Sequence, residues 1–177
     1  MGIAGSGKGT QGKLLADARG YKVLSTGELF RKYGSPDQHA RMHNGELIGD
    51  DETTTLFDKA LQNLSDQNRT IIDGYPRSVA QSKWLLAQAT TGRFDIQYVL
   101  HLQASREAVK DRIHARARAD DHEAAIEARF KEYDQTTVPI LDYYRSHDIE
   151  VIEVNGEQPI YDVHKEIIAI DLRHEQA

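Results

Sequence analysis

The feature that most restricts the fold is a glycine-rich stretch at the start of the chain. Residues 2–10 read GIAGSGKGT, which fits the pattern G-x-x-x-x-G-K with a hydroxyl two places after the lysine. Glycines let successive backbone N–H groups turn toward one anion, which side chains would otherwise crowd. Lys8 adds a point charge for the outer phosphates of a nucleotide, and Thr10 offers a hydroxyl near a phosphate-bound Mg²⁺. The stretch therefore predicts a phosphate-binding loop.

Residues 9–18 continue as a predicted helix, whose positive N-terminal end would point at the same phosphates. Two other interpretations exist for this stretch. One is a glycine-rich turn that binds nothing, and the other is an N-myristoylation pattern formed by Gly2 and Ser6. Because that pattern overlaps the phosphate-binding loop, we interpret it as a coincidence.

Composition indicates a soluble globular protein of a single domain spanning residues 1–177. The net charge of −6 argues against a general polyanion-binding surface, so we expect no nucleic-acid partner. The absence of cysteine excludes disulfides and zinc sites built on thiolates. No apolar run approaches the roughly 20 residues that span a membrane. We therefore expect a cytoplasmic protein with no membrane partner, which acts as a monomer.

Short apolar runs alternate with helical stretches along the chain. The predicted strands are 21–25, 70–73, 96–102 and 149–154, and the predicted helices are 28–32, 52–64, 79–89, 105–117, 122–146 and 160–170. This alternation predicts an α/β fold, with a parallel sheet that carries helices on both faces. Breaks at 34–36 and 44–45 predict a small irregular insertion after the first strand, over the face where such sheets bind ligands.

Four further signals fall at or after predicted strand ends. They are STGELFR at 25–31, GELIGD at 45–50, DGYPR at 73–77, and a set of arginines at positions 112, 116, 118 and 129. Each has a simple structural explanation by itself. Thr26 could cap a helix, Asp73 could begin an ordinary turn, and Arg112 could lie on a solvated helix face.

Taken together and in this order behind the phosphate-binding loop, these segments resemble the adenylate kinase family. The resemblance runs from Gly2 to about Val163 and is carried by GSGKGTQ at 5–11, STG at 25–27 and DGYPR at 73–77. It implies a P-loop kinase fold with a small AMP-binding insertion at 26–50 and a lid. It also implies reversible transfer of the γ-phosphoryl group of MgATP to AMP, which gives two molecules of ADP.

The resemblance also implies a role for each matching residue. The ATP site would comprise Gly5, Ser6, Gly7, Lys8, Gly9, Thr10, Arg112, Arg116 and Gln158. The AMP site would comprise Thr26, Arg31, Glu46, Leu47, Ile48, Gly74, Tyr75, Pro76, Arg77, Gln81, Arg118 and Arg129. Catalysis would fall to Lys8, Arg77, Arg116, Arg118 and Arg129, and Mg²⁺ would lie near Thr10 and Asp73.

Phosphoryl transfer explains why arginines are required. Its loose transition state leaves the protein to align the two nucleotides and to stabilise charge on the equatorial oxygens. Guanidinium groups match phosphate bidentately and stay charged at any working pH. Thr26 and Gln81 favour AMP as acceptor, since related pyrimidine monophosphate kinases tend to carry Ala and Asn at these positions.

The sequence departs from the family pattern in three places. Only Met1 precedes Gly2, whereas the family has a central strand there, so we interpret the chain as incomplete or mis-started and expect a gap in the sheet. The lid, at 112–121, is vestigial, because Ala117 alone separates Arg116 from Arg118, and it leaves no room for a lid zinc. The 26–50 insertion is trimmed. Two alternatives are another nucleoside monophosphate as acceptor, and a nucleotide-binding protein with little catalysis.

Overall fold

Helices and short strands alternate along the chain, and the computed structural model describes residues 1–44, 46, 48–64, 70–116 and 122–175. The strands are β1 (Lys22–Ser25), β2 (Thr70–Asp73), β3 (Val99–Gln103) and β4 (Val151–Asn155). The helices are α1 (Lys8–Arg19), α2 (Thr26–Tyr33), α3 (Pro36–His43), α4 (Asp50–Gln62), α5 (Val79–Thr90), α6 (Arg106–Arg116), α7 (Glu123–Glu132), α8 (Val138–Arg145) and α9 (Ile160–Glu175), with a π-helical turn at Tyr133–Thr137.

The strands form two parallel pairs. β1 pairs with β2, with Lys22 opposite Thr70, and β3 pairs with β4, with Val99 opposite Val151. The predicted parallel arrangement is therefore confirmed, but it consists of two half-sheets. Within the described ranges, no strand pairs with the facing edges of β2 and β3. The gap expected from the sequence is present in the structure.

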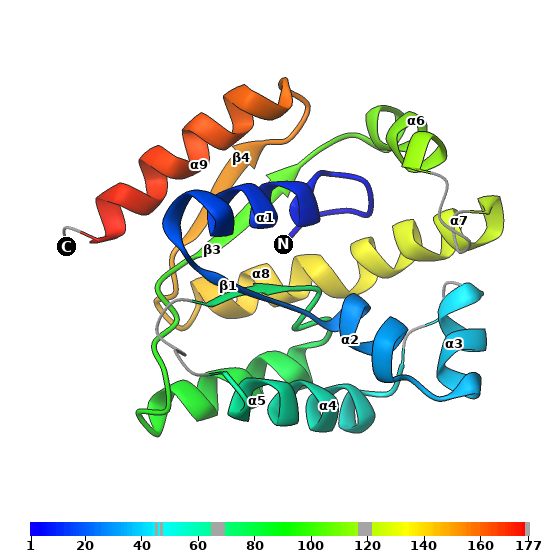
Figure 1. Ribbon diagram of the computed structural model, residues 1–177, viewed down its shortest axis with the longest axis horizontal. Helices are drawn as coiled ribbons and strands as arrows, with labels where there is room; N and C mark the ends of the chain where they lie inside the picture. Colours follow the sequence, from blue (N-terminus) through cyan, green and yellow to red (C-terminus); the bar gives the residue numbers. More distant parts are fainter. Residues whose placement is uncertain (45, 47, 65–69, 117–121, 176–177) are drawn as a thin grey trace.

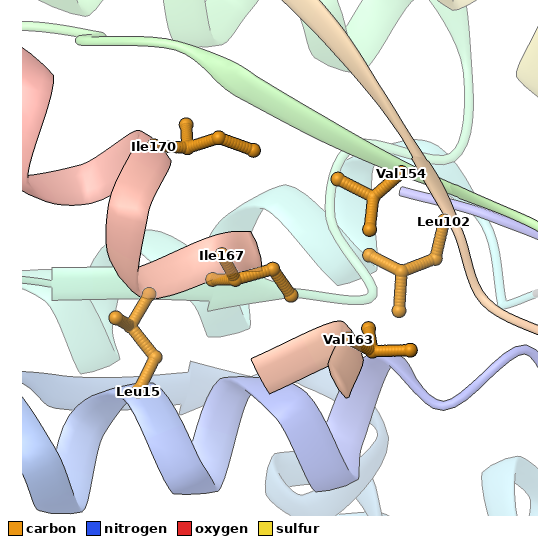
Figure 2. Close-up of a cluster of buried hydrophobic side chains, with 6 residues drawn as sticks. All are labelled: Leu15, Leu102, Val154, Val163, Ile167 and Ile170. Carbon is orange, nitrogen blue, oxygen red and sulfur yellow. The ribbon is translucent and has the colours of Figure 1, made fainter. Parts of the chain in front are cut away.

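Helices cover both faces of these strands (Figure 1). On one side α1 contacts β1 and β2, while α9 contacts α1 and β4. On the other side α8 contacts β4 and α5. Figure 2 shows the apolar cluster under α1 and α9, in which side chains from both helices meet those of β3 and β4. Its buried members are Leu15, Leu102, Val154, Val163, Ile167 and Ile170.

Two further apolar clusters fix the parts that carry the site. Phe57 of α4 stacks on Tyr75, with ring centroids 4.1 Å apart, and both rings meet Trp84 of α5 edge-on. This cluster anchors the segment that follows β2. In the third cluster, Ile3 packs against a set of side chains from α6 and α7. The phosphate-binding loop is therefore fastened to the same two helices that carry the predicted arginines.

The predicted irregular insertion is wrong in one respect, because residues 36–43 form α3. The reason is a capping box in which the Ser35 side chain accepts from the Gln38 backbone N–H and the Gln38 side chain accepts from the Ser35 N–H. Pro36 occupies the first turn, where a missing N–H has no cost. The sequence prediction interpreted Gly34-Ser35-Pro36 only as a break, although it also begins a helix.

The predicted helix over 122–146 is interrupted by a π-helical turn. α7, this turn and α8 run as one long rod across the molecule (Figure 1). Pro139, in the first turn of α8, has no N–H to donate, and its ring would clash with the carbonyl four residues earlier in an α-helix. A wider π turn relieves that clash. The proline thus explains the position of the interruption.

Candidate functional site

The glycine-rich loop is built from backbone conformations that favour glycine. Gly2, Gly5 and Gly7 have φ values of 143°, 85° and 102°. A Cβ on Gly5 would lie 2.8 Å from Cβ of Val109, so the loop packs closely on α6. Gly7 is the N-cap of α1 and offers no side chain to the N–H groups of the first turn, which leaves them for a ligand.

Lys8 and Asp73 lie at the same end of this loop. The Lys8 Nζ donates to the carbonyl oxygens of Gly2 and Ile3, at 2.6 and 2.8 Å. The Asp73 carboxylate ends β2, and its Oδ2 is 3.8 Å from the place of a Cβ on Gly9. A cation and a carboxylate thus flank the loop where the outer phosphates of a nucleotide would lie.

The residues predicted to serve a metal fit magnesium. Thr10 and Asp73 supply a hydroxyl and a carboxylate, which are the hard oxygen donors that Mg²⁺ prefers. In the part of the chain that the structure describes, no group of three or more His, Cys, Asp or Glu side chains is placed to hold a metal ion. This donor set suits an ion that takes its remaining ligands from water and phosphate.

The two residues predicted to contact the ATP base meet at the loop after β4, which carries Gln158 and which Arg112 contacts from α6. Arg112 donates to the carbonyl oxygens of Gly156 and Glu157, at 2.7 and 3.3 Å. Gln158 donates to Glu166 at 3.2 Å. A Cβ on Gly156 would lie 2.9 Å from the Ser6 carbonyl oxygen, so this loop also touches the phosphate-binding loop. The two predicted parts of the ATP site are therefore contiguous.

The carboxylate of Glu157 helps to shape this loop. It accepts a hydrogen bond from the backbone N–H of Ser105 at 2.7 Å, which holds the pKa of the Glu157 carboxyl below its usual value. The bond ties the β4 loop to the start of α6, the helix that carries Arg112. The bond between Ser105 and Glu157 thus helps to hold the Arg112 guanidinium against the β4 loop.

The segments STGELFR and DGYPR meet at the ends of β1 and β2. The Thr26 hydroxyl donates to the Gly74 carbonyl at 2.7 Å, and the Arg77 Nε donates to the same oxygen at 3.0 Å. A Cβ on Gly27 would lie 3.5 Å from both terminal nitrogens of Arg31. Thr26 and Arg77, two residues predicted to bind AMP, therefore contact the same carbonyl oxygen, and Arg31 lies close to Gly27 on the same helix as Thr26.

Gln81 holds this region together through both atoms of its amide. Its Oε1 accepts from the Arg77 backbone N–H at 2.7 Å, and its Nε2 donates to Asp50 Oδ1 at 2.8 Å. The residue is 2% exposed. A primary amide has two N–H groups and two oxygen lone pairs, so each atom keeps capacity for one further bond. Base recognition and this internal role are compatible.

Other predicted AMP-site residues have internal contacts of their own. Tyr75 is buried, which raises the pKa of its phenol to about 12, and its hydroxyl lies 3.1 Å from the Thr54 hydroxyl. Its ring is thus part of the core, and Pro76 follows it directly. Ile48 is also buried, whereas the exposed Glu46 carboxylate lies 3.9 Å from Arg41.

The predicted arginines of α6 and α7 are described only in part. Leu47 and Arg118 lie outside the described residues, and so does the side chain of Arg116, although its backbone ends α6. Arg129 lies in α7, one turn before Glu132. Glu132 pairs with Arg77 across 3.6 Å, so α7 reaches the acceptor side of the site. The structure therefore brings Arg77 and the helix of Arg129 together.

Sequence reasoning missed three participants. Glu132 holds Arg77, Asp50 holds Gln81 through a bond from Nε2, and the Gly156 carbonyl holds Arg112. All three contacts join segments far apart in the chain, which a single sequence does not reveal.

Comparisons with known proteins cover most of the chain. A family model described as adenylate kinase matches residues 1–149. A Mycobacterium tuberculosis protein named adenylate kinase is 40% identical over 152 residues, which cover 82% of this chain and 83% of its own. Adenylate kinases of a Synechococcus species and of Prochlorococcus marinus are 36% and 35% identical, over 89% of this chain and over 88% and 89% of theirs.

Proposed function

We propose how the site residues share the work in a chain that belongs to the adenylate kinase family and transfers a phosphoryl group from ATP to AMP, giving two molecules of ADP. The observation that supports these roles is that the predicted ATP side and the predicted AMP side of the site both contact helix α7. The phosphate-binding loop packs on α6 and α7, and Glu132 of α7 pairs with Arg77 beside Gly74. Donor and acceptor groups therefore face one region of the molecule.

The loop and the first turn of α1 bind the ATP phosphates. Backbone N–H groups of Gly5 to Thr10 cradle the anion, and Lys8 exchanges its two carbonyl partners for phosphate oxygens. Arg112 lies against the adenine together with the 156–158 backbone. Magnesium, held near Thr10 and Asp73, supplies charge neutralisation on the phosphates when it is bound.

AMP binds on the opposite side of the region. Arg31 and Arg77 hold its phosphate, while Thr26 and Gly74 with the backbone of 46–48 surround the nucleoside. Gln81 offers its remaining donor and acceptor to the adenine edge. Arg116, Arg118 and Arg129 complete the ring of guanidinium groups around the transferred phosphoryl group, where each such group is worth about 10³ to 10⁵ in rate.

No general base is required in this mechanism, because the AMP phosphate is already a nucleophilic anion. The work of the chain is to align the two nucleotides and to place fixed positive charge at the equatorial oxygens of the moving group. Arg77 leaves Glu132 for phosphate during this process. The ion pair thus keeps the guanidinium oriented before AMP arrives.

A coupled assay of ADP formation tests these roles with a panel of nucleoside monophosphates. Arg77→Ala is expected to lower kcat/KM for AMP about 10³-fold or more. Arg145→Ala is the matched control, since Arg145 pairs with Glu153 at 3.0 Å on another part of the surface. Equal losses in both variants would contradict the role of Arg77.

Acceptor choice is tested with Gln81→Ala in the same panel. We expect this variant to accept other monophosphates relatively better, while the KM for ATP stays unchanged. Equal loss for every acceptor would show that Gln81 acts only through its bonds to the Arg77 backbone and Asp50. ATP binding without turnover in the unmodified chain would contradict the catalytic assignment itself.

We further propose that the chain acts as a single-domain monomer in which 26–50 is a reduced AMP-binding insertion and 112–121 a vestigial lid. This proposal rests on the sequence, because 117–121 lie outside the described residues. A shortened lid excludes water less completely, so ATP hydrolysis without AMP is expected. Light scattering measures the oligomeric state, and phosphate release without AMP measures the hydrolysis.

The described residues include no helix with the length and apolar character needed to cross a lipid bilayer.

A further inference from the structure

The groups around Gln81 form a circuit of hydrogen bonds in which each donor and each acceptor is fixed. The Gln81 backbone N–H donates to the Ser78 Oγ at 3.1 Å, and the Ser78 hydroxyl donates to Asp50 Oδ2 at 2.6 Å. The other carboxylate oxygen, Oδ1, accepts from the Gln81 Nε2 at 2.8 Å. The Gln81 Oε1 accepts from the Arg77 backbone N–H at 2.7 Å. Asp50 thus binds both the Gln81 amide and the hydroxyl group that caps α5.

The chemistry of its two partners decides which way the Gln81 amide points. A carboxylate only accepts hydrogen bonds, and a backbone N–H only donates them. The amide nitrogen therefore faces Asp50, and the amide oxygen faces the Arg77 N–H. Turning the amide over would set oxygen against carboxylate and N–H₂ against N–H, so both bonds would be lost. Because Gln81 is buried, solvent gives little compensation for such a loss.

Two helices that pack against each other carry this circuit. Asp50 is the first residue of α4, Gln81 lies in the first turn of α5, and the two helices lie side by side (Figure 1). The stack of Phe57 on Tyr75, with Trp84 edge-on to both rings, joins them in the core. The N-terminal end of α4 also favours the negative charge of Asp50. The core therefore holds the carboxylate at the position from which it orients the Gln81 amide.

A fixed amide offers its remaining bonds in a fixed order. Nε2 keeps one N–H group for a ligand, and Oε1 keeps one lone pair. Adenine presents an amino donor beside a ring-nitrogen acceptor, and it pairs with the amide in one orientation. Hypoxanthine, the base of inosine monophosphate (IMP), has a carbonyl acceptor in place of the amino group and an N–H donor in place of the ring acceptor N1. Its edge pairs with the inverted amide.

We propose that Asp50 is a positioning residue for acceptor specificity, which locks the Gln81 amide in the orientation that pairs with adenine and rejects oxopurines such as hypoxanthine. This inference rests on the proposed contact between Gln81 and the acceptor base, and it adds the residue that gives this contact a direction. The base is tethered through its ribose to a phosphate held by Arg31 and Arg77, so it does not turn over to suit the amide. A mismatched oxopurine leaves buried polar groups unpaired, and a site built on such bonds rejects it strongly.

The quantity to measure is the preference for AMP over IMP, which is the ratio of their kcat/KM values in the assay of diphosphate formation. IMP is also measured as an inhibitor that competes with AMP, which defines its affinity when its turnover is slow. Asp50→Asn keeps the size of the side chain and adds an N–H₂ group, which can donate to an inverted Gln81 amide. We expect the AMP:IMP preference to fall about tenfold or more, since a hydrogen bond to a charged group no longer opposes the inversion. The KM for ATP should stay unchanged.

Asp51→Asn is the matched control, because Asp51 follows Asp50 in the first turn of α4 and loses the same charge. It should keep the AMP:IMP preference of the unmodified chain, and an equal fall in this control would overturn the proposal. Asp50→Ala is a second variant, which removes the carboxylate without supplying a donor and should also lower the preference. Melting temperatures identify any variant that is not folded.

Gln81→Ala tests whether Asp50 acts through the amide. In that background, Asp50→Asn is expected to change the AMP:IMP preference no further. A further change would overturn the proposal. Equal losses for AMP and IMP in Asp50→Asn alone would also overturn it, because a purely structural role of Asp50 weakens both acceptors alike.

The inference about Asp50 and the proposed role of Gln81 fail in different ways. If Gln81→Ala alters the AMP:IMP preference and Asp50→Asn does not, the inference about Asp50 is wrong and the role of Gln81 stands. If Gln81→Ala leaves the preference unchanged, Gln81 does not read the acceptor base, and both are wrong.

Discussion

Replacing Gly5 by alanine is expected to test how tightly the phosphate-binding loop is fastened to α6. The backbone φ of Gly5 is 85°, in the left-handed region, where an L-residue costs about 1–2 kcal/mol. The new Cβ would lie 2.8 Å from Cβ of Val109 and 2.9 Å from Ile113, both of which are completely buried. Overpacking of such a site adds about 1–3 kcal/mol.

Gly92→Ala separates these two effects. Gly92 has a φ of 76°, almost the same backbone strain, but no atom lies within 4 Å of the place of its Cβ. Each alanine also restricts the unfolded chain, which stabilises both variants by about 0.4–1 kcal/mol. We therefore expect a net loss of about 0.5–1 kcal/mol for Gly92→Ala and about 2–4 kcal/mol for Gly5→Ala.

Urea unfolding, followed through the fluorescence of Trp84, measures both losses, and the coupled assay measures the KM for ATP. Only Gly5→Ala should raise that KM, because it displaces the loop that faces the phosphates. Stability losses that agree within about 0.5 kcal/mol would refute the reasoning. They would mean that the loop lifts from α6 without cost, so the packing of Val109 and Ile113 would not fix its position.

Three other changes address single contacts. Glu132→Gln frees Arg77 from its ion pair and should lower the KM for AMP about twofold, with less than about 1 kcal/mol change in stability because the pair is partly exposed; an unchanged KM for AMP would contradict the exchange of partners. Burial lowers the pKa of His101 to about 4, whereas a histidine in an unfolded chain titrates near 6.5. The unfolded chain therefore binds the proton first, and thermal melts should show stability falling as pH drops from about 6.5 to 4, with a smaller slope in His101→Gln. Tyr98→Phe removes a 2.7 Å bond to the buried Asp171 carboxylate and should cost about 1.5–3 kcal/mol in urea unfolding, with kcat unchanged.

Most element positions could be predicted from the sequence, because they depend on local pattern. The run at 70–73 is a strand as predicted, and α1 and α5 lie within one residue of their predicted bounds. α3 was missed, since its signal is the spacing of Ser35 and Gln38 rather than an apolar period, and no α3 residue is buried. A pattern of burial does not reveal a helix that buries nothing.

The candidate site could be predicted as a set of residues but not as a network. The resemblance to the adenylate kinase family gave Arg77 and Gln81 as ligand-binding candidates. It did not show that the Gln81 Oε1 accepts from the Arg77 backbone N–H, or that the Gln81 Nε2 donates to the Asp50 carboxylate. The contact between Gln81 and Asp50 depends on how two segments 31 residues apart pack together, and this information is tertiary.

The π-helical turn at Tyr133–Thr137 sets the phase between two parts of one rod. An α-helix advances about 100° per residue, so the extra residue of a π turn rotates everything after it by about that angle. α7 can therefore present Ile126 and Phe130 to the phosphate-binding loop while α8 buries Tyr144 in a different direction. Evolution could not delete one residue here without misaligning two interfaces at once. Pro139 thus sets the angle between the face of α7 that packs on the phosphate-binding loop and the face of α8 that is buried in the core.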